Sequence, residues 1–447
     1  MIPREEPLIS VGILTDSKIK FELYGDFSVA GSKENFSGVF TAELKDDSIV
    51  CKSAHRRIES LNEIEFIPSD PVSESFLIRD VVIGKKFHWE RKEKQRFIYS
   101  LSLVKDGKQI IAINRIPLER YLTSVISSEM NAKSSIELLK AQAVIARSWI
   151  LTQIFRSKGL KDNNETLKTT VELKDELIKW YDREDHKLYD VCADDHCQRF
   201  QGVTKIISDS AYTAVEQTNG IVLLSSGNIC DARYSKCCGG VTESFENVWE
   251  TVKHPYLASV VDYKYAPENY NLDFSDEENS KQWITGVPTA YCNTSDDKIL
   301  SHILVDYDKE TKDFFRWTVE YSQVEISALI KEKSNIDFGE ILDLVPVERG
   351  SSARLVKLKI IGTQKTLIVG KELEIRRILS SSHLYSSAFI VKKIGKQIPE
   401  KFILYGAGWG HGVGLCQIGA AVMAEKGFNF DEILLHYFSN SELKKIY

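Results

Sequence analysis

The sequence predicts an α+β fold, with a β-rich core that contains a buried helical pair and a second, smaller β-rich domain. Short apolar runs separated by Gly or Asp dominate residues 8–115 and recur over residues 301–400, which is typical of strands. Between them, residues 116–150 have apolar side chains at helical spacing. A chain of 447 residues is long enough for two or three structural units, each with a buried core.

Charge and hydropathy argue against two broad classes of protein: those with a large nucleic-acid-binding surface and those with transmembrane helices. A formal net charge of -6 argues against a large nucleic-acid-binding surface, because such surfaces neutralise phosphates with Lys and Arg. No run of 18 or more apolar residues occurs, so we expect no transmembrane helix. The first residues contain no apolar stretch of the kind found in signal peptides.

The N-terminal half begins with strands and continues with two helices. We expect strands at Ile9–Leu14, Ile19–Tyr24, Phe97–Val104 and Gln109–Asn114. Pro117 suits the first turn of a helix that continues through Leu118 and Ile126. The second helix begins after Ser134 or Ser135, continues to Ile150, and is apolar on most sides, which indicates burial.

The C-terminal half alternates between polar connections and short elements. Residues 160–186 are highly charged and predict a helical excursion or surface loop, and residues 263–300 predict a long surface connection. We expect four further helices, near Val324–Lys333, Phe338–Leu344, Gln417–Lys426 and Phe430–Phe438. These observations divide the chain into residues 1–115, 116–262, 263–400 and 401–447.

Glu129 is the first residue with a pattern that suggests chemistry. Leu122, Val125 and Glu129 lie at positions i, i+3 and i+7, so the carboxylate falls on the apolar face of the first helix. Burial raises the pKa of a carboxyl group, and a raised pKa suits a general acid that cleaves a glycosidic bond. The alternative is a structural carboxylate that pairs with Arg or caps the next helix.

A second candidate site is the segment from His186 to Gln198. Two Cys and two His within twelve residues offer the ligands that zinc prefers. The alternatives are a disulfide between Cys192 and Cys197, or core thiols with surface histidines.

Two further segments combine Cys, His and Gly. Cys237 and Cys238 are adjacent, so they can pack in the core, bind zinc, bond a distant partner, or provide a nucleophile with His411 as its base. The glycine-rich loop, residues 406–414, allows close approach of a ligand and contains Trp409 and His411, which suit a sugar-binding groove. The alternative for this loop is a tight structural turn.

Taken together, these segments resemble the family of stage II sporulation protein D and the amidase enhancer LytB. The residues that carry the resemblance occur in the family's order: Ile116–Met130, Leu138–Arg147, Asp190–Gln198, Cys238–Glu243 with Val248-Trp249, and Gly408–Gly414 followed by Gln417–Ala420.

The resemblance implies a peptidoglycan lytic transglycosylase with Glu129 as its catalytic residue. Glu129 would protonate the glycosidic oxygen between N-acetylmuramic acid and N-acetylglucosamine, and would then act as the base while the muramic C6 hydroxyl attacks C1. The product has a 1,6-anhydro end, no water is consumed, and one carboxyl group suffices, unlike in most glycoside hydrolases. The implied substrate is glycan stripped of stem peptides, which would make an amidase the natural partner.

The resemblance also implies a zinc ion of structural rather than catalytic role, held by His186, Cys192 and Cys197. His196 and Cys238 are the candidates for a fourth ligand, and Cys237 is a further one. We expect substrate contacts from eight residues in or near the shared motifs: Arg147, Gln198, Tyr234, Glu243, Trp249, Trp409, His411 and Gln417.

Two other functions stay open at this point. One is a non-catalytic, wall-binding enhancer of an N-acetylmuramoyl-L-alanine amidase, and the other is a cysteine-dependent hydrolase that uses Cys237 or Cys238 with His411. The family acts outside the cytoplasmic membrane, so we expect a cell-envelope location with a leader or lipid anchor that this sequence does not display. Within the catalytic unit, residues 1–115 would form the β-rich start, residues 116–262 the core with the zinc loop, and residues 401–447 the closing part.

Overall fold

The computed structural model describes residues 2–84, 90–131, 133–163, 169–180, 186–194, 196–206, 208–303 and 313–447. The chain has an α+β fold with several sheets, as predicted. It divides into two compact units, and each is built from separated parts of the chain. Unit 1 comprises Met1–Phe155, Asp185–Val222 and Lys444–Tyr447, and unit 2 comprises Arg156–Glu184 and Leu223–Leu443.

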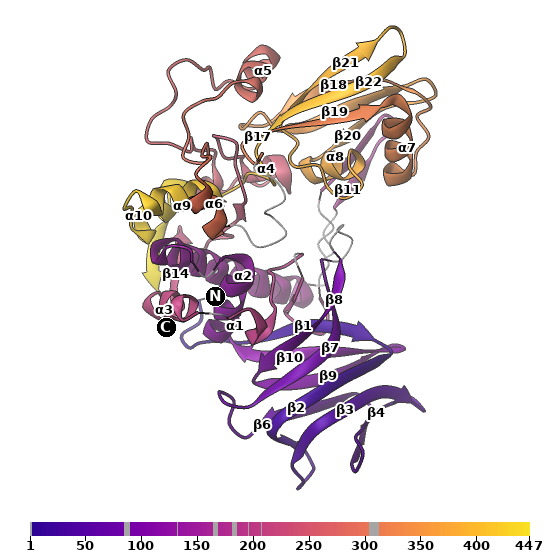
Figure 1. Ribbon diagram of the computed structural model, residues 1–447, viewed down its shortest axis with the longest axis vertical. Helices are drawn as coiled ribbons and strands as arrows, with labels where there is room; N and C mark the ends of the chain where they lie inside the picture. The colour runs from indigo at the N-terminus through magenta and orange to yellow at the C-terminus, as the bar shows by residue number, and fades with distance from the viewer. Residues whose placement is uncertain are drawn as a thin grey trace. The chain divides into compact units, whose positions relative to one another are not determined.

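Unit 1 is built on one large sheet, whose main path has the strand order β13-β1-β10-β9-β6-β2-β3-β4-β5, with β7 and β8 paired beside β2 (Figure 1). Strands β2 and β6 alternate buried and exposed residues, so one face of the sheet packs on a core that includes Phe21, Phe40 and Phe66. The strands are β1 (Leu8–Asp16), β2 (Lys18–Val29), β3 (Phe36–Lys45), β4 (Ser48–Lys52), β5 (Arg57–Ser60), β6 (Glu63–Pro68), β7 (Ser75–Ile83), β8 (Arg91–Ile98), β9 (Ser100–Asp106), β10 (Gln109–Pro117) and β13 (Val191–Cys192).

Two helices follow β10 along the chain, as predicted, and the second extends beyond the predicted Ile150 to Asn163. Helix α1 (Leu118–Glu129) begins directly after Pro117, and Leu122 and Val125 on its apolar face are fully buried. Helix α2 (Ile136–Asn163) is buried over nearly all positions from Leu138 to Leu151, as its apolar sequence predicts. Unit 1 also contains the short helices η1 (Gly202–Lys205) and α3 (Ser210–Gln217).

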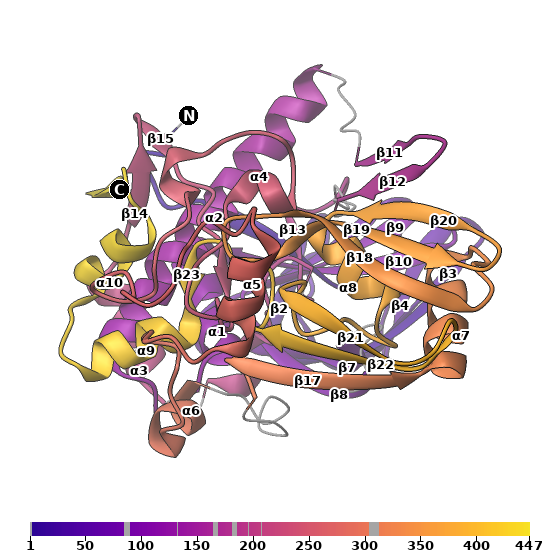
Figure 2. The ribbon, with the colours of Figure 1, turned by 90° about the horizontal axis from the view of Figure 1, so that it is seen from above.

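Unit 2 contains two larger sheets that share one apolar core. Helix α7 (Gln323–Ser334) contacts β17 and β22, helix α8 (Glu372–Ile378) contacts β19 and β20, and Figure 2 shows the two sheets as separate groups of strands. One sheet has the order β11-β12-β20-β19-β18 and the other β17-β22-β21. The strands are β11 (Thr170–Glu172), β12 (Glu176–Lys179), β17 (Arg316–Ser322), β18 (Ile341–Arg349), β19 (Leu355–Gly362), β20 (Thr366–Gly370), β21 (Phe389–Gly395) and β22 (Pro399–Ala407).

The remaining elements are short. They are β14 (Ile221–Ser225), β15 (Asn228–Ile229), β16 (Tyr234–Ser235), α4 (Phe245–Val248), η2 (Pro255–Leu257), α5 (Glu277–Thr285), α6 (Asp297–Ile303), β23 (Leu415–Cys416), α9 (Gln417–Glu425), α10 (Phe430–Tyr437) and β24 (Glu442–Lys445). No helix in the described part of the chain has the length and apolar character needed to cross a membrane.

Several predictions about the C-terminal half need correction. The helix predicted at Phe338–Leu344 is wrong, because Ile341 begins β18, which pairs antiparallel with β19. The charged segment 160–186 contains β11 and β12 among its described residues, rather than only helix or loop. The polar segment 263–300 is more than a surface connection, since α5 inserts Trp283 and Ile284 into a buried cluster. The other three predicted helices are confirmed as α7, α9 and α10.

Candidate functional site

Unit 1 brings together two His and two Cys side chains in one cluster. The ligand atoms of His186, Cys192, His196 and Cys197 all lie within 4.8 Å of one another. His186 Nε2 and His196 Nδ1 each lie 3.4 Å from Cys197 Sγ, and His196 Nδ1 lies 3.9 Å from Cys192 Sγ. On a tetrahedral zinc, a nitrogen and a sulfur ligand are about 3.6 Å apart, given bond lengths of about 2.0–2.1 and 2.3 Å. The four donor atoms therefore fit a zinc ion.

The cluster is positioned by the edge of the large sheet. Strand β13 pairs parallel with β1, which places Cys192 opposite Gly12. The Tyr189 ring packs so closely against Gly12 that a Cβ at that position would lie 2.6 Å from it. Asp190 accepts hydrogen bonds from the backbone N–H and the hydroxyl of Ser10. Hydrogen bonds from Cys197, then His186 and His196, lower the pKa of the Cys192 thiol and favour the thiolate that a metal needs.

The segment that follows Cys197 packs against helix α1 and orients Glu129. The Arg199 backbone N–H donates to Glu129 Oε1 at 3.1 Å, and the Gln201 N–H donates to the Ser128 hydroxyl at 3.2 Å. Ser124 donates to the Gly202 carbonyl at 2.7 Å. Glu129 is the last residue of α1 and is only partly buried, unlike Leu122 and Val125 on the same face. One carboxylate oxygen is thus held by the backbone while the group keeps some exposed surface.

Tyr121 and Gln198 form a buried contact next to Arg199, the residue whose N–H holds Glu129. The Tyr121 ring is fully buried, stacks on Phe200 at 5.1 Å, and donates from its hydroxyl to Gln198 Oε1 at 3.2 Å. Burial, then the nearby acidic groups of Cys197, Cys192 and Glu129, raise the pKa of Tyr121 well above its usual value. Gln198 is 1% exposed, so in this structure it supports the loop and offers almost no surface to a ligand.

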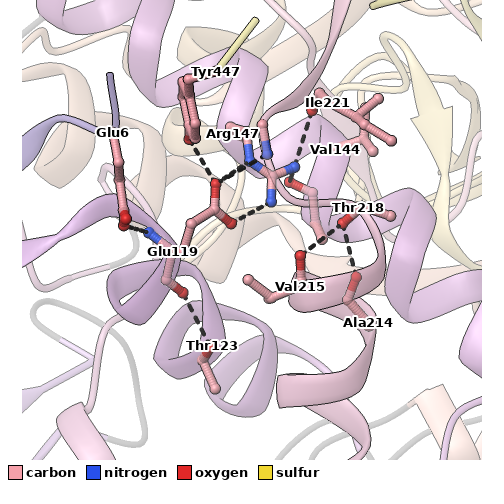
Figure 3. A network of polar contacts seen from close by, with 12 residues as sticks. Glu6, Glu119, Thr123, Val144, Arg147, Ala214, Val215, Thr218, Ile221 and Tyr447 are labelled. Carbon is pink, nitrogen blue, oxygen red and sulfur yellow. Dashed lines mark hydrogen bonds and ion pairs between the residues drawn. The ribbon is translucent and has the colours of Figure 1, made fainter. Parts of the chain in front are cut away.

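Arg147 lies in a buried ion pair that the sequence did not indicate (Figure 3). Its Nε and Nη2 donate to the two carboxylate oxygens of Glu119, at 2.9 and 2.5 Å, and its Nη1 donates to the Ile221 carbonyl. The Tyr447 hydroxyl and the Gly220 N–H also donate to Glu119. Arg147 is 0% exposed, so contact with a glycan is not open to it in this structure. The pair fixes the first turn of α1, ten residues before Glu129.

The glycine-rich loop of unit 2 adopts backbone angles that only glycine tolerates well. Gly408, Gly410, Gly412 and Gly414 all have positive φ, between 73° and 90°. A Cβ on Gly412 would lie 2.4 Å from the Arg354 guanidinium, so this position also requires the absence of a side chain. These angles fit the tight structural turn that the sequence left open as the alternative for this loop.

Arg354 and Glu243 both form hydrogen bonds with the glycine-rich loop. The sequence analysis did not identify Arg354 as a candidate residue. The Arg354 guanidinium is 1% exposed and donates to the carbonyls of Cys238 and Gly410. Glu243, which we expected to bind substrate, is 0% exposed and accepts hydrogen bonds from Ser351 and Ser352. The Glu243 N–H donates to the Gly412 carbonyl. Both side chains are therefore inaccessible supports of the loop in this structure.

Aromatic groups gather around the loop and remain partly exposed. The Trp409 ring stacks on Tyr385 at 4.2 Å, and the Trp249 ring lies 4.9 Å from His411 with the Arg233 guanidinium 4.5 Å over its face. Both Trp side chains are partly exposed, which suits contact with a sugar. Tyr234 is also partly buried and pairs through β16 with Leu415, whereas Gln417 is 3% exposed at the start of α9.

His411 and the cysteine pair do not form a catalytic dyad in this structure. The Val413 N–H donates to His411 Nδ1 at 3.0 Å, and His411 also bonds the Tyr234 backbone. Burial, then the Arg233 charge, lower the pKa of His411 well below its usual value. Cys237 and Cys238 are 0% and 2% exposed, and burial raises the pKa of both thiols. These environments give no support to a cysteine nucleophile.

Two family models match the chain over separate ranges. Residues 106–224 match the model described as stage II sporulation protein, and residues 243–414 match a domain of unknown function, DUF8618. The first range contains α1, Glu129 and the Cys/His cluster. The second contains the whole glycine-rich loop, residues 406–414.

Three similar proteins are 25–26% identical to this chain over the aligned residues. The stage II sporulation protein D of Bacillus subtilis is 26% identical over 341 residues, which cover 75% of this chain and 76% of that protein. An uncharacterised protein of Brachyspira hyodysenteriae is 25% identical over 346 residues, 77% of this chain and 71% of that protein. The amidase enhancer of Bacillus subtilis is 26% identical over 337 residues, but the match spans only 40% of the enhancer.

The predicted resemblance is thus confirmed by both kinds of comparison, over the segment that holds Glu129 and over three quarters of the chain. The chain is similar to stage II sporulation protein D and to the amidase enhancer over about three quarters of its length, and residues 106–224 match the stage II sporulation protein model.

Proposed function

We propose that the protein is a peptidoglycan lytic transglycosylase, with Glu129 as the catalytic acid and base. The observation that carries the proposal is the setting of Glu129. The Arg199 N–H holds one of its oxygens, it keeps exposed surface, and the Cys/His cluster braces the same loop. The similarity to stage II sporulation protein D and to the amidase enhancer supports this proposal.

Glu129 would act twice on the glycan. As an acid it gives its proton to the oxygen between N-acetylmuramic acid and N-acetylglucosamine, and the C1–O bond breaks. As a base it takes the proton of the muramic C6 hydroxyl, whose oxygen bonds to C1 and closes the 1,6-anhydro ring. The carboxyl group regains its proton and no water is consumed, so a second catalytic carboxylate is not required. The hydrogen bond from Arg199 fixes the carboxylate for both steps.

The metal would have a structural role. His186, Cys192, His196 and Cys197 would hold a zinc ion with all four positions filled by protein, as in structural sites. His196 is therefore the better fourth ligand, because Cys238 belongs to a different group of side chains. The bound ion would fix the loop that runs through Gln198 and Arg199 to α1.

We also propose that the partly exposed aromatic groups in and around the glycine-rich loop bind glycan. Trp249 and Trp409 are partly exposed aromatic side chains beside or within this loop, of the kind that stacks on a pyranose. As the resemblance implies, this glycan would be stripped of stem peptides, an amidase would be the natural partner, and the location would be the cell envelope.

The direct test is mass spectrometry of purified glycan strands after incubation with the protein. We expect 1,6-anhydro-muramic ends from the wild type and a loss of about 10²–10⁴-fold in rate for Glu129→Gln. The matched control is Glu216→Gln, an exposed carboxylate on α3 of the same unit, which should keep wild-type activity. Equal activity of Glu129→Gln and the wild type would overturn the proposal.

The second candidate is a non-catalytic enhancer of a wall amidase, which the similarity to the amidase enhancer favours. It predicts that neither the wild type nor Glu129→Gln releases glycan products. Both would then stimulate a purified N-acetylmuramoyl-L-alanine amidase to the same extent on intact peptidoglycan.

A further inference from the structure

Unit 2 contains a second cluster of metal-binding side chains, which lies apart in the sequence from the segment discussed above. Three thiols and one carboxylate have ligand atoms within 4.8 Å of one another: Cys238, Asp262, Cys292 and Cys416. All four are buried, with exposures of 0–2%. Cys238 Sγ lies 3.6 Å from Cys292 Sγ, close to the separation of about 3.8 Å between two thiolates on one tetrahedral zinc.

The groups around the cluster hold these side chains in place, as the neighbours of metal ligands do. Asp262 accepts from the Cys292 N–H at 2.8 Å through one oxygen and from the Tyr437 hydroxyl through the other. The Cys238 N–H donates to Cys416 Sγ at 3.2 Å. A Cβ on Gly419 would lie 2.3 Å from Asp262, so α9 approaches the carboxylate as closely as it does only because glycine stands there. The donors are thus oriented toward a common centre.

Two guanidinium groups lie beside the Cys238 end of the cluster. The Arg354 guanidinium donates to the Cys238 carbonyl at 3.0 Å, and the Arg316 guanidinium donates to the Gly239 carbonyl at 3.1 Å. Three thiolates, a carboxylate and a divalent ion together carry a charge of -2, which would be costly to bury without nearby cations. Two guanidinium groups beside the cluster reduce that cost.

Four separate segments meet here, in a part of unit 2 with little regular structure. Cys238 follows β16, Asp262 follows η2, Cys292 precedes α6, and Cys416 lies in β23 directly before α9. A bound ion would cross-link all four segments, whereas a disulfide would cross-link only two. Soft thiolate ligands select zinc among the common structural ions, and four protein ligands leave no open position for catalysis.

We propose a buried structural zinc site in unit 2, whose four ligands are Cys238, Asp262, Cys292 and Cys416. Binding displaces the protons of the three thiols to solvent, so no oxidant or reductant is needed. Its role is to hold the segment before Gly239 and the segment after Gly414, and so to keep the glycine-rich loop in place. This proposal does not depend on the catalytic role of Glu129.

The test is the metal content of the purified full chain, measured by inductively coupled plasma mass spectrometry. We expect about two zinc ions per chain in the wild type and about one in the Cys192→Ser/Cys197→Ser variant, which leaves the unit 2 cluster intact. The remaining ion, exchanged for Co²⁺, should show the strong sulfur-to-cobalt charge-transfer absorption of several thiolate ligands. A metal-free Cys192→Ser/Cys197→Ser variant that is folded by circular dichroism would overturn the proposal.

A second pair of variants tests the ligand assignment. In the same background, Cys292→Ser should remove the last ion, whereas Cys237→Ser should retain it, since Cys237 is equally buried but lies outside the set of four. Loss of metal in Cys237→Ser with retention in Asp262→Asn would overturn the assignment of Asp262.

Alkylation without reductant, under denaturing and chelating conditions, completes the test. The proposal predicts that all eight cysteines react. Four unreactive cysteines would show two disulfides in place of the metal, and would contradict the proposal even if Cys292→Ser failed to fold.

Discussion

Breaking the ion pair between Glu119 and Arg147 should destabilise unit 1 strongly. The Arg147 side chain is fully buried and that of Glu119 is 10% exposed, so neither charge can turn to water when its partner is removed. Arg147→Met removes two charge-assisted hydrogen bonds to Glu119 and the bond to the Ile221 carbonyl, while keeping most of the side-chain volume. Removing one partner of such a pair costs about 3–5 kcal/mol in the free energy of unfolding.

The assay must resolve a free-energy change of this size within unit 1 alone. A cost of about 3 kcal/mol is a roughly 150-fold change in the unfolding equilibrium, since 1.4 kcal/mol corresponds to a factor of ten. Because the chain has two units, a single melting temperature does not report on unit 1 alone. Hydrogen exchange of the α1 amides, read by mass spectrometry at the peptide level, gives the local free energy of opening.

The double variant Glu119→Gln/Arg147→Met separates the pair from other causes. With both charges gone, its cost should be at least about 1 kcal/mol smaller than the sum of the two single costs. Costs that simply add, or an Arg147→Met cost below about 1 kcal/mol, would refute the reasoning. An unchanged α1 together with weaker glycan binding would return Arg147 to the substrate-contact role that the sequence analysis expected.

Three further predictions follow from the site geometry. Cys192→Ser should lose about one zinc ion per chain relative to Cys51→Ser, a buried cysteine outside both clusters, and equal metal content in the two variants would contradict the zinc assignment. Burial, then the charges of Arg376, Arg377 and Lys333, lower the pKa of His383 to about 4, so the folded state disfavours its protonation. Stability present above pH ~6.5 should therefore be lost as the pH falls toward 4, and melting curves of His383→Gln should depend less on pH over that window; an unchanged slope would count against it. Gly412→Ala should cost about 1–2 kcal/mol of backbone strain and more from contact with Arg354, whereas Gly227→Ala, with φ of 78° and open space, should cost the strain alone. Equal losses in urea unfolding would show that the Arg354 contact is unimportant.

Local periodicity was sufficient to predict the two helices that follow β10, the first of which contains the candidate residue Glu129. Leu122 and Val125 lie at helical spacing and are buried, and the second helix, which is apolar on most sides, is buried from Leu138 to Leu151 except at Lys140. The same reasoning failed at Phe338–Leu344, because apolar residues at 338, 341 and 344 are three apart, as in a helix. Antiparallel pairing with β19 makes the second part of that range a strand. Pairing over distance is invisible to local spacing.

The candidate sites also divide into those with a short-range sequence pattern, which could be predicted, and those assembled over long distances in the sequence, which could not. His186, Cys192 and Cys197 were recognisable because they lie within twelve residues. The unit 2 cluster was not, because Cys238 and Cys416 are 178 residues apart and Asp262 and Cys292 have no pattern around them. Glu119 and Arg354 were missed because an isolated charge in a sequence predicts a solvated surface, and only the fold supplies their buried partners.

Glycan cleavage in water labelled with heavy oxygen tests the central claim most directly. If Glu129 passes the proton between the glycosidic oxygen and the muramic C6 hydroxyl, every new muramic end is an anhydro ring, one water lighter than a reducing end, and contains no label. Labelled reducing ends, or unlabelled anhydro ends that Glu129→Gln produces as fast as the wild type, would contradict the account.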